Sequence, residues 1–188
     1  MRRIVIADFL LDDVVERALA EDLSGGDVTS AAVVAEEERA IARAVAHVPL
    51  VVCGGNVFAR AFYKVDPGVR VEQRLADGKR AQPGDVLWIV EGSARSLLMA
   101  ERTALNFAQR MSGVATMTRA FVDAIPPGSA LRVVDIRKTT PGLRFLERYA
   151  VRIGGGHNHR DCLGSAVLIK DNHIVSAGGI TAAIQRAR

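Results

Sequence analysis

The stretch LRVVDIRKTTPGLRFLERYAVRIGGGHNHRDCLGSAVLIKDNH, residues 131–173, decides the fold that we expect. It opens with the apolar run LRVVDI, continues with PGLRFLERYAVRI at helical spacing, and returns to a second apolar run, SAVLIK. Short apolar strands that alternate with helices are typical of parallel βα units, so this half of the chain predicts the α/β class. The closing segment GGITAAIQRAR predicts one more helix, with Thr181 as its N-cap.

The first hundred residues predict a different arrangement, mixed α+β with antiparallel strands. Apolar side chains at helical spacing over 12–23 predict a helix, and the glycines of SGGDVTS (24–30) end it in a turn. A further short helix is expected over 56–63. Strands are expected over 40–52, 69–75 and 85–91.

The middle of the chain predicts the boundary between two domains. From Ser93 the pattern predicts one or two long helices, which we expect to break near Ser112-Gly113, and PPGS (126–129) forms a turn after them. We therefore expect an amino-terminal domain with its linking helix over 1–112. A second domain, over 113–188, would carry the functional site.

Composition places the chain among cytoplasmic proteins with no membrane partner. It has 188 residues, 49% of them hydrophobic and 24% charged, which is enough for a core and one or two domains. No apolar run approaches the roughly 20 residues that cross a bilayer. Acids at Asp8, Asp12 and Asp13 interrupt the start that an export signal would need. Cys53 and Cys162 are too few for a disulfide framework, which favours a reducing compartment.

The net charge of +4 comes almost entirely from arginine. Only four lysines are present, namely Lys64, Lys79, Lys138 and Lys170. A compositional bias towards arginine explains this charge as well as a function does. Nucleic-acid binding would need clustered cations with aromatic residues between them. Because the arginines are scattered and only 5% of the residues are aromatic, we expect no nucleic-acid partner.

Cations follow both apolar runs at the point where each strand would end. Arg137-Lys138-Thr139-Thr140 follows LRVVDI, and Lys170-Asp171-Asn172-His173 follows SAVLIK. Ligand sites of α/β proteins form at the carboxyl ends of parallel strands. Either tetrad alone is explained by the solvation of a strand end. Their coincidence, with two of the four lysines, predicts a shared site for an anion.

The loop GGGHNHR (154–160) adds donors to the same predicted site. Three glycines allow the backbone to approach a ligand closely and to direct N–H groups at an anion. His159 and Arg160 supply side-chain donors, and arginine suits a carboxylate because its planar fork makes two parallel hydrogen bonds. The alternative is a helix C-cap followed by an incidentally basic loop.

Other chemistries have weaker patterns. His157, His159 and Cys162 could bind zinc, but an arginine lies among them and the neighbouring groups are cationic, which disfavours a divalent cation. Ser165 and Ser176 lack a nucleophile-elbow motif. Phosphate-loop and dinucleotide-binding glycine patterns are absent from the sequence.

Four long motifs, in order, resemble those of one family. They are EDLSGGDVTS (21–30), AERTALNFAQRMSGVAT (100–116), DIRKTTPGLRFLERYAVRIGGGHNHR (135–160) and AVLIKDNHI (166–174). From about residue 12 to its end the chain is similar to the quinolinate phosphoribosyltransferases, also called nicotinate-nucleotide pyrophosphorylases. The resemblance implies an enzyme of NAD biosynthesis that converts quinolinate and phosphoribosyl pyrophosphate, with Mg²⁺, into nicotinate mononucleotide, pyrophosphate and carbon dioxide. It also implies an α/β sandwich domain followed by an α/β barrel, assembled as a homodimer or larger homo-oligomer.

The resemblance also assigns residues to the site. The substrate-binding set is Arg102, Ile136, Arg137, Lys138, His159, Arg160 and Lys170. Arg137, His159 and Arg160 match groups that bind quinolinate. Lys138 and Lys170 match catalytic lysines that face the phosphoribosyl donor and the substrate carboxylates.

Arg102 owes its place in this set to the resemblance alone. By the residue pattern it is an ordinary helix-surface arginine, paired with Glu101 or another neighbour. In the family it matches an arginine that the neighbouring subunit contributes to the pocket.

The chain departs from the family pattern in two places. Ile136 stands where the family usually has threonine, which removes a hydroxyl contact. The chain stops at Arg188, after its second βα unit, whereas a complete barrel needs about 250 residues. The family's acidic metal ligands lie beyond this point, so we expect no metal ligand within the chain and little activity from these residues alone. The alternatives are a related family associated with molybdenum transport operons and a non-catalytic remnant.

Overall fold

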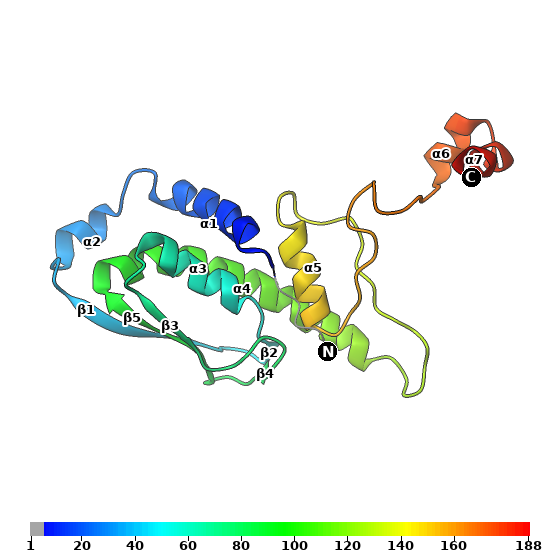
Figure 1. The fold of residues 1–188 in the computed structure, drawn as a ribbon. Helices are drawn as coiled ribbons and strands as arrows, with labels where there is room; N and C mark the ends of the chain where they lie inside the picture. Colours follow the sequence, from blue (N-terminus) through cyan, green and yellow to red (C-terminus); the bar gives the residue numbers. More distant parts are fainter. Residues whose placement is uncertain (1–5) are drawn as a thin grey trace.

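The computed structural model describes residues 6–188, so the basic start of the chain and the first residues of the expected amino-terminal domain lie outside it. An antiparallel sheet forms the first half (Figure 1). Its strands, in spatial order, are β1 (Arg39–Val45), β5 (Val86–Ser93) and β3 (Arg70–Gln73). A separate two-stranded ribbon pairs β2 (Leu50–Val51) with β4 (Arg80–Ala81). The α/β class and the antiparallel strands of the first half are confirmed.

Helices cover one face of this sheet. The helices are α1 (Asp8–Leu23), α3 (Gly55–Val65) and the long α4 (Ala94–Asp123). α3 and α4 contact the strands, and α1 packs against both of these helices. Phe58 of α3 stacks on the buried ring of Trp88 in β5 with 4.6 Å between ring centroids, and Phe62 lies one helical turn further on. Each such buried ring contributes about 1.5–3 kcal/mol, and the helices expected over 12–23 and 56–63 are confirmed.

A short helix, α2 (Val28–Val33), lies partly where only a turn was expected. Asp27 caps it, since the carboxylate accepts a hydrogen bond from the Ser30 N–H at 2.9 Å. Hydrogen bonds from Ser30 also hold the pKa of Asp27 below its usual value. The turn over 24–27 is therefore followed directly by a capped helix rather than by a loop.

The helix α4 runs without a break over 30 residues, so the break expected near Ser112-Gly113 is wrong. The buried Ser112 hydroxyl accepts from the Cys53 N–H at 3.0 Å and donates to the Cys53 carbonyl at 3.1 Å. The apolar face continues across this point from Ala108 to Ala115, so packing outweighs the low helix propensity of one glycine. The domain boundary at 112–113 stays a prediction, and it falls inside a helix.

The two parallel strands expected in the second half are wrong for the described residues. LRVVDI makes one parallel bridge, between Val134 and His157, and SAVLIK belongs to no strand. A parallel strand is stable only when neighbours hydrogen-bond to it, and within 6–188 these two runs find only that single pairing. The helix expected between them is confirmed as α5 (Arg144–Ile153).

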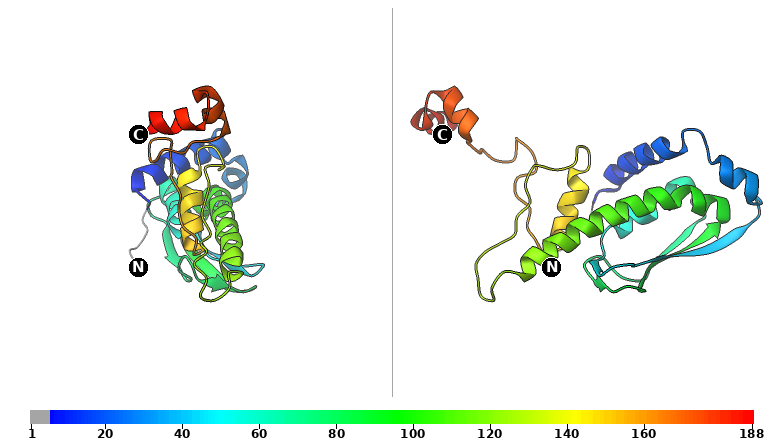
Figure 2. Two further views of the ribbon diagram at one scale, coloured as in Figure 1. Left: turned by 90° about the vertical axis from the view of Figure 1, so that its right-hand side faces the viewer. Right: turned by 180° about the vertical axis from the view of Figure 1, so that it is seen from behind.

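Two short helices end the chain. They are α6 (Asp171–Ala177), which was not expected, and α7 (Ile180–Ala187), which was. They pack on each other away from the sheet, at the end of an irregular segment (Figure 2). The N-cap of α7 is Gly179 with no side-chain cap, so the cap expected at Thr181 is wrong. Within residues 6–188, no helix is both long and apolar enough to cross a membrane.

The glycines of GGGHNHR close the end of α5 and do not cradle an anion. The N–H groups of Gly154, Gly155 and Gly156 donate at 2.9–3.0 Å to the carbonyls of Ala150, Arg152 and Val151. A Cβ on Gly154 would lie 2.5 Å from the Ala115 carbonyl oxygen of α4, so this position needs glycine for close approach. The C-cap alternative is therefore correct, and these N–H groups are not available to a ligand.

Replacing Gly154 by alanine should destabilise the protein by about 1–3 kcal/mol, the usual cost of overpacking. The added Cβ would meet the backbone of α4, which cannot rotate aside as a side chain does. Gly113→Ala is the matched control within α4, because no described atom outside its chain neighbours and its own helix backbone lies within 4 Å of its Cβ position, and alanine favours a helix by about 0.5–1 kcal/mol. Urea denaturation measures both changes, and equal stability of the two variants would contradict the packing role of Gly154.

Candidate functional site

A single parallel bridge brings two of the cationic segments together. The His157 N–H donates to the Val133 carbonyl at 2.9 Å, and the Asp135 N–H donates to the His157 carbonyl at 3.0 Å. Because the two segments run in the same direction, both leave the bridge at the same end. Arg137-Lys138 and His159-Arg160 therefore follow the bridge on two neighbouring segments.

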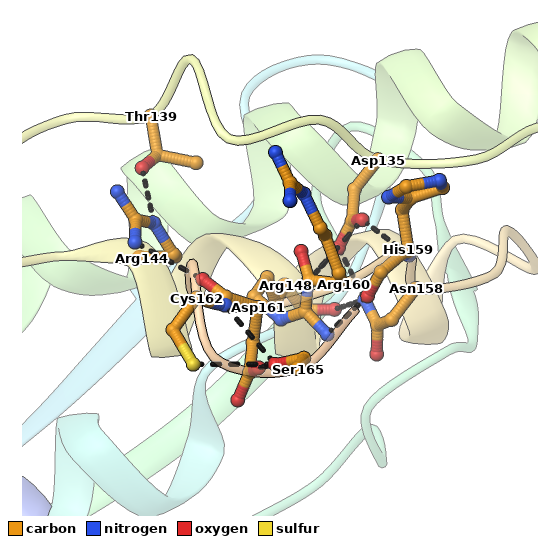
Figure 3. A network of polar contacts seen from close by, with 10 residues as sticks. All are labelled: Asp135, Thr139, Arg144, Arg148, Asn158, His159, Arg160, Asp161, Cys162 and Ser165. Carbon is orange, nitrogen blue, oxygen red and sulfur yellow. Dashed lines mark hydrogen bonds and ion pairs between the residues drawn. The ribbon is translucent and has the colours of Figure 1, made fainter. Parts of the chain in front are cut away.

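The carboxylate of Asp135 ties both segments to α5 (Figure 3). Its side chain is only 5% exposed and pairs with the Arg148 guanidinium at 3.1 Å. It also accepts hydrogen bonds from the Asn158 amide at 2.6 Å and from the His159 N–H at 2.7 Å. Arg148 donates to the His159 carbonyl at 2.9 Å, so one arginine holds both segments. A buried carboxylate is stable only with donors of this number and kind.

Glu147, which precedes Arg148 in α5, holds the Thr140 end of the segment 135–140. It accepts hydrogen bonds from the Thr140 hydroxyl at 2.7 Å and from Arg110 of α4 at 2.5 Å. Partial burial by itself raises the pKa of Glu147, but the hydrogen bonds from Arg110 and Thr140 outweigh burial and lower that pKa below its usual value. The segment that carries Arg137 and Lys138 is thus fastened at both ends.

The arginines around this segment fall into two groups. Arg110, Arg144 and Arg148 direct their guanidinium groups at protein oxygens. By contrast, Nε of Arg137 and Nε of Arg160 are buried and have no hydrogen-bond partner in the part of the chain that is described. Arg160 also donates from Nη1 to the Ala166 carbonyl at 2.8 Å, so only part of its guanidinium lacks an acceptor. A buried donor without an acceptor is costly, so an anionic ligand would stabilise both groups.

The remaining predicted residues are exposed or lie elsewhere. Lys138 and the His159 ring make no hydrogen bond or ion pair with any described residue. Arg102 is exposed on α4, and no ion pair with Glu101 forms there. Lys170 precedes α6, where its N–H donates to His173 Nδ1 at 3.0 Å, and α6 lies away from the bridge. The structure therefore does not bring Arg102 or Lys170 to the bridge.

One hollow does connect the bridge region with the last two helices. A cavity of about 340 Å³ is lined by Arg160, by His173 of α6 and by Arg186 of α7, with apolar side chains between them. Arg137, Lys138 and His159 do not line it. The predicted cations thus do not all converge on this one hollow.

Comparison with known proteins finds two matching family models, one for each half of the chain. The family described as quinolinate phosphoribosyl transferase, N-terminal domain, matches residues 27–112, and the C-terminal domain of the same family matches residues 114–188. The chain belongs to the quinolinate phosphoribosyltransferase family. The family expected from the four sequence motifs is therefore confirmed.

Curated relatives of this chain have names consistent with the family. A nicotinate-nucleotide pyrophosphorylase [carboxylating] of Mycobacterium leprae is 45% identical over 180 residues, which cover 94% of this chain and 63% of the relative. The quinolinate phosphoribosyltransferase [decarboxylating] 1b of Nicotiana tabacum is 42% identical, covering 93% of this chain and 49% of its own. The chain thus spans about half to two thirds of the length of these relatives.

Solved structures share the fold of this family member. NadC from Streptococcus pyogenes superposes with a TM-score of 0.93 at 41% identity, covering 99% of this chain and 66% of its own. The nicotinate-nucleotide pyrophosphorylase from Francisella tularensis gives a TM-score of 0.90 at 36% identity, covering 97% of this chain and 64% of its own.

The described residues of this chain offer no cluster of side chains for a metal ion. Within 6–188, no group of three or more histidine, cysteine or acidic side chains could hold one. The carboxylates of Asp135 and Glu147 pair with arginines, and the Asp161 carboxylate accepts a hydrogen bond from the Ser165 hydroxyl. Ile136, which stands where the family usually has threonine, is 60% exposed and offers no ligand atom.

Sequence reasoning missed the three residues that organise this site, namely Asp135, Arg148 and Asn158. Asp135 stands two residues before Arg137, and Asn158 stands between two histidines, so each was overlooked beside a more conspicuous neighbour. A useful signal was available, because a lone acid at the end of an apolar run needs a cation for its burial. Arg148 lies on the helix that follows that run.

Removing the Glu147 charge should make the free energy of unfolding depend less on pH at acid pH. The folded-state pKa of Glu147 lies below its unfolded value of roughly 4.3. Its stabilising contribution is therefore complete above that pH and is lost as the pH falls through the lower folded value. Glu147→Gln should be less stable than the wild type at pH 7 and should lose less stability between pH 7 and pH 3. Urea denaturation across this range measures the difference, and an unchanged acid slope would contradict it.

Proposed function

We propose that the protein of this chain catalyses the family reaction, in which quinolinate and phosphoribosyl pyrophosphate give nicotinate mononucleotide, pyrophosphate and carbon dioxide. One observation carries the proposal beyond family membership. Arg137 and Arg160 leave the same end of the parallel bridge, and each has a buried Nε with no partner in residues 6–188. Two such groups suit an anion with two carboxylates, which quinolinate is.

The cations divide between the two substrates according to their chemistry. The guanidinium forks of Arg137 and Arg160, with His159, bind the ring carboxylates. The compact ammonium groups of Lys138 and Lys170 suit phosphate charge, and we assign them to the departing pyrophosphate. Because Lys170 lies away from the bridge within residues 6–188, its role requires α6 to lie beside the bridge in the whole protein. Arg102 stays exposed on α4, which agrees with a role towards the pocket of a neighbouring subunit in a homodimer or larger homo-oligomer.

Binding and orientation account for the chemistry, with no covalent intermediate on the protein. The pyridine nitrogen attacks the anomeric carbon of the ribose, and the bond from that carbon to pyrophosphate breaks as the ribose becomes oxocarbenium-like. The ring nitrogen is then quaternary and positive. The carboxylate on the adjacent carbon leaves as carbon dioxide, the electron pair remains on that carbon, and a proton replaces the carboxylate.

Mg²⁺ is proposed as a companion of the phosphoribosyl pyrophosphate, whose oxygens are the hard ligands that it prefers. No residue of the described chain is assigned to it. We also propose action in the cytoplasm, in keeping with the scarcity of cysteine.

Arg137→Ala and Arg160→Ala should each weaken quinolinate binding by about 2–5 kcal/mol, the usual cost of removing one partner of a close charge pair. Arg74→Ala is the control, because this exposed arginine follows β3 and pairs with Glu72 outside the site. Calorimetric titration with quinolinate measures the three variants. An unchanged affinity in either site variant would remove that residue from the site.

The chain of 188 residues should turn over little or no quinolinate by itself. A fusion of this chain to the carboxy-terminal third of the Mycobacterium leprae relative should release pyrophosphate in a quinolinate-dependent way. Substitution of Arg137 in the fusion should abolish that release. Rapid turnover by the 188 residues alone would contradict the expectation, and an inactive but folded fusion would favour a non-catalytic remnant.

A further inference from the structure

The two segments that carry the candidate quinolinate ligands are irregular in structure. Apart from the bridge at Val134 and His157, residues 131–140 and 157–160 belong to no strand or helix. Backbone outside such elements is free to adopt several conformations unless other contacts restrain it. A bidentate contact between arginine and a carboxylate, however, requires the two groups to be placed within about 0.5 Å. Something other than the bridge must therefore fix Arg137 relative to Arg160.

The Asp135 carboxylate is the group that can do so, because both of its oxygens are held. Oδ1 accepts the His159 N–H at 2.7 Å, and Oδ2 accepts the Asn158 amide at 2.6 Å. Arg148 lies 3.1 Å from Oδ2 and 3.3 Å from Oδ1, so it spans the carboxylate. With a donor on each oxygen, the plane of the carboxylate cannot turn. The backbone of one segment is thereby fixed to a side chain of the other.

The same contacts reach the second segment through its carbonyl groups. Arg148 donates from Nη2 to the His159 carbonyl at 2.9 Å and from Nη1 to the Arg160 carbonyl at 3.4 Å. The Asn158 amide also donates to the Arg148 carbonyl of α5 at 3.0 Å. The backbone carbonyls on both sides of Arg160 are therefore held by the single helix α5. The same helix holds Asp135, which stands two residues before Arg137.

We propose that Asp135 is a positioning residue of this site, acting through Arg148 and Asn158 to set the distance and angle between Arg137 and Arg160. The inference rests on the proposed function, because it takes quinolinate as the ligand that the two arginines share. Asp135 is shielded from solvent and does not touch the ligand. It determines affinity by placing the groups that do.

The chemistry of the cluster requires a carboxylate at this position. Asparagine has the same shape but only one acceptor oxygen, so its NH₂ group would face a donor of Arg148, Asn158 or His159. Asp135→Asn should therefore release one side of the cluster without leaving a cavity. Asn158→Ala is a milder variant, since it removes one hydrogen bond to Asp135 and leaves the ion pair with Arg148 in place.

Asp77→Asn is a matched control for these variants. The Asp77 carboxylate accepts four hydrogen bonds, from the N–H groups of Gly54 and Gly55, from Gln73 and from the Tyr149 hydroxyl of α5. Asp77 thus has four partners where Asp135 has three, and both aspartates contact α5. None of its partners lies in 131–140 or 157–160. A merely structural loss should affect both aspartates alike, whereas a positioning role belongs to Asp135 alone.

The experiment uses the full chain of 188 residues, labelled with nitrogen-15, at a temperature where denaturation shows every variant to be folded. NMR titration with quinolinate gives the dissociation constant, and hydrogen exchange on the same samples gives the protection of the His159 amide. We expect Asp135→Asn to weaken quinolinate binding at least tenfold and to speed exchange of the His159 amide at least tenfold. Asn158→Ala should weaken binding about threefold, and Asp77→Asn should leave both quantities within about twofold of the wild type.

The outcomes separate this inference from the proposed function. If the wild-type chain binds no quinolinate, the proposed function fails in this chain, and exchange of the His159 amide alone then decides whether Asp135 orders the segment. If the wild type binds but folded Asp135→Asn binds equally well, positioning by Asp135 is overturned while the function stands. If Asp77→Asn loses as much affinity as Asp135→Asn, the loss reflects general stability. This result would also overturn the positioning role of Asp135.

Discussion

A buried carboxylate must be given a donor on each oxygen, and around Asp135 this requirement organises the second half of the chain. The 5% exposed side chain collects a guanidinium, an amide and a backbone N–H, which come from α5 and from the loop after it. Arg148 follows Asp135 by 13 residues, and Asn158 and His159 follow it by 23 and 24, so they meet Asp135 only when the chain folds back on itself. The contacts that satisfy this one charge also hold residues 157–160 beside the bridge at Val134.

The helix α5 joins this cluster to the rest of the protein. Glu147 contacts Arg110 of α4, and the Tyr149 hydroxyl donates to Asp77, in the loop before β4, at 2.9 Å. The close approach of Gly154 to α4 adds a steric constraint to these polar contacts. α4 also packs on β1 and β5. The segments that carry the arginines are therefore connected, through α5 and then α4, to the core around Trp88.

Arginine serves two purposes in this small region, and its surroundings distinguish them. Where a carboxylate or carbonyl lies within reach, as for Arg110, Arg144 and Arg148, the guanidinium cross-links the chain. Where Nε is buried without an acceptor among the described residues, as for Arg137 and Arg160, one donor of the guanidinium stays unpaired, and in Arg160 this holds beside a bond from Nη1 to the Ala166 carbonyl. The same residue type thus provides both the scaffold and the groups that we propose bind substrate, and an unpaired buried Nε marks the second group.

The sequence by itself determined most elements whose signal is local. Apolar residues at helical spacing predicted α1 and α5, and apolar runs on either side of a turn-rich stretch predicted β3 and β5, because such signals do not depend on what covers the element. The short helices α2 and α6 were not expected. The long motifs identified the family, since their order and length exceed what composition alone produces. Arg137 and Arg160 were also singled out from the sequence, Arg137 because it follows an apolar run and Arg160 because it ends the glycine-rich loop 154–160.

Only the tertiary structure decided what depends on partners distant in the chain. LRVVDI and SAVLIK have strand-like composition, but a parallel strand requires neighbours that these residues do not supply within 6–188. The continuity of α4 through Gly113 depended on a hydroxyl bonded to Cys53, and the glycine triplet served a contact with Ala115 rather than a ligand. Asp135 became central for the same reason, since a charge is worth burying only where folding delivers its donors, and no local pattern records where those donors will come from.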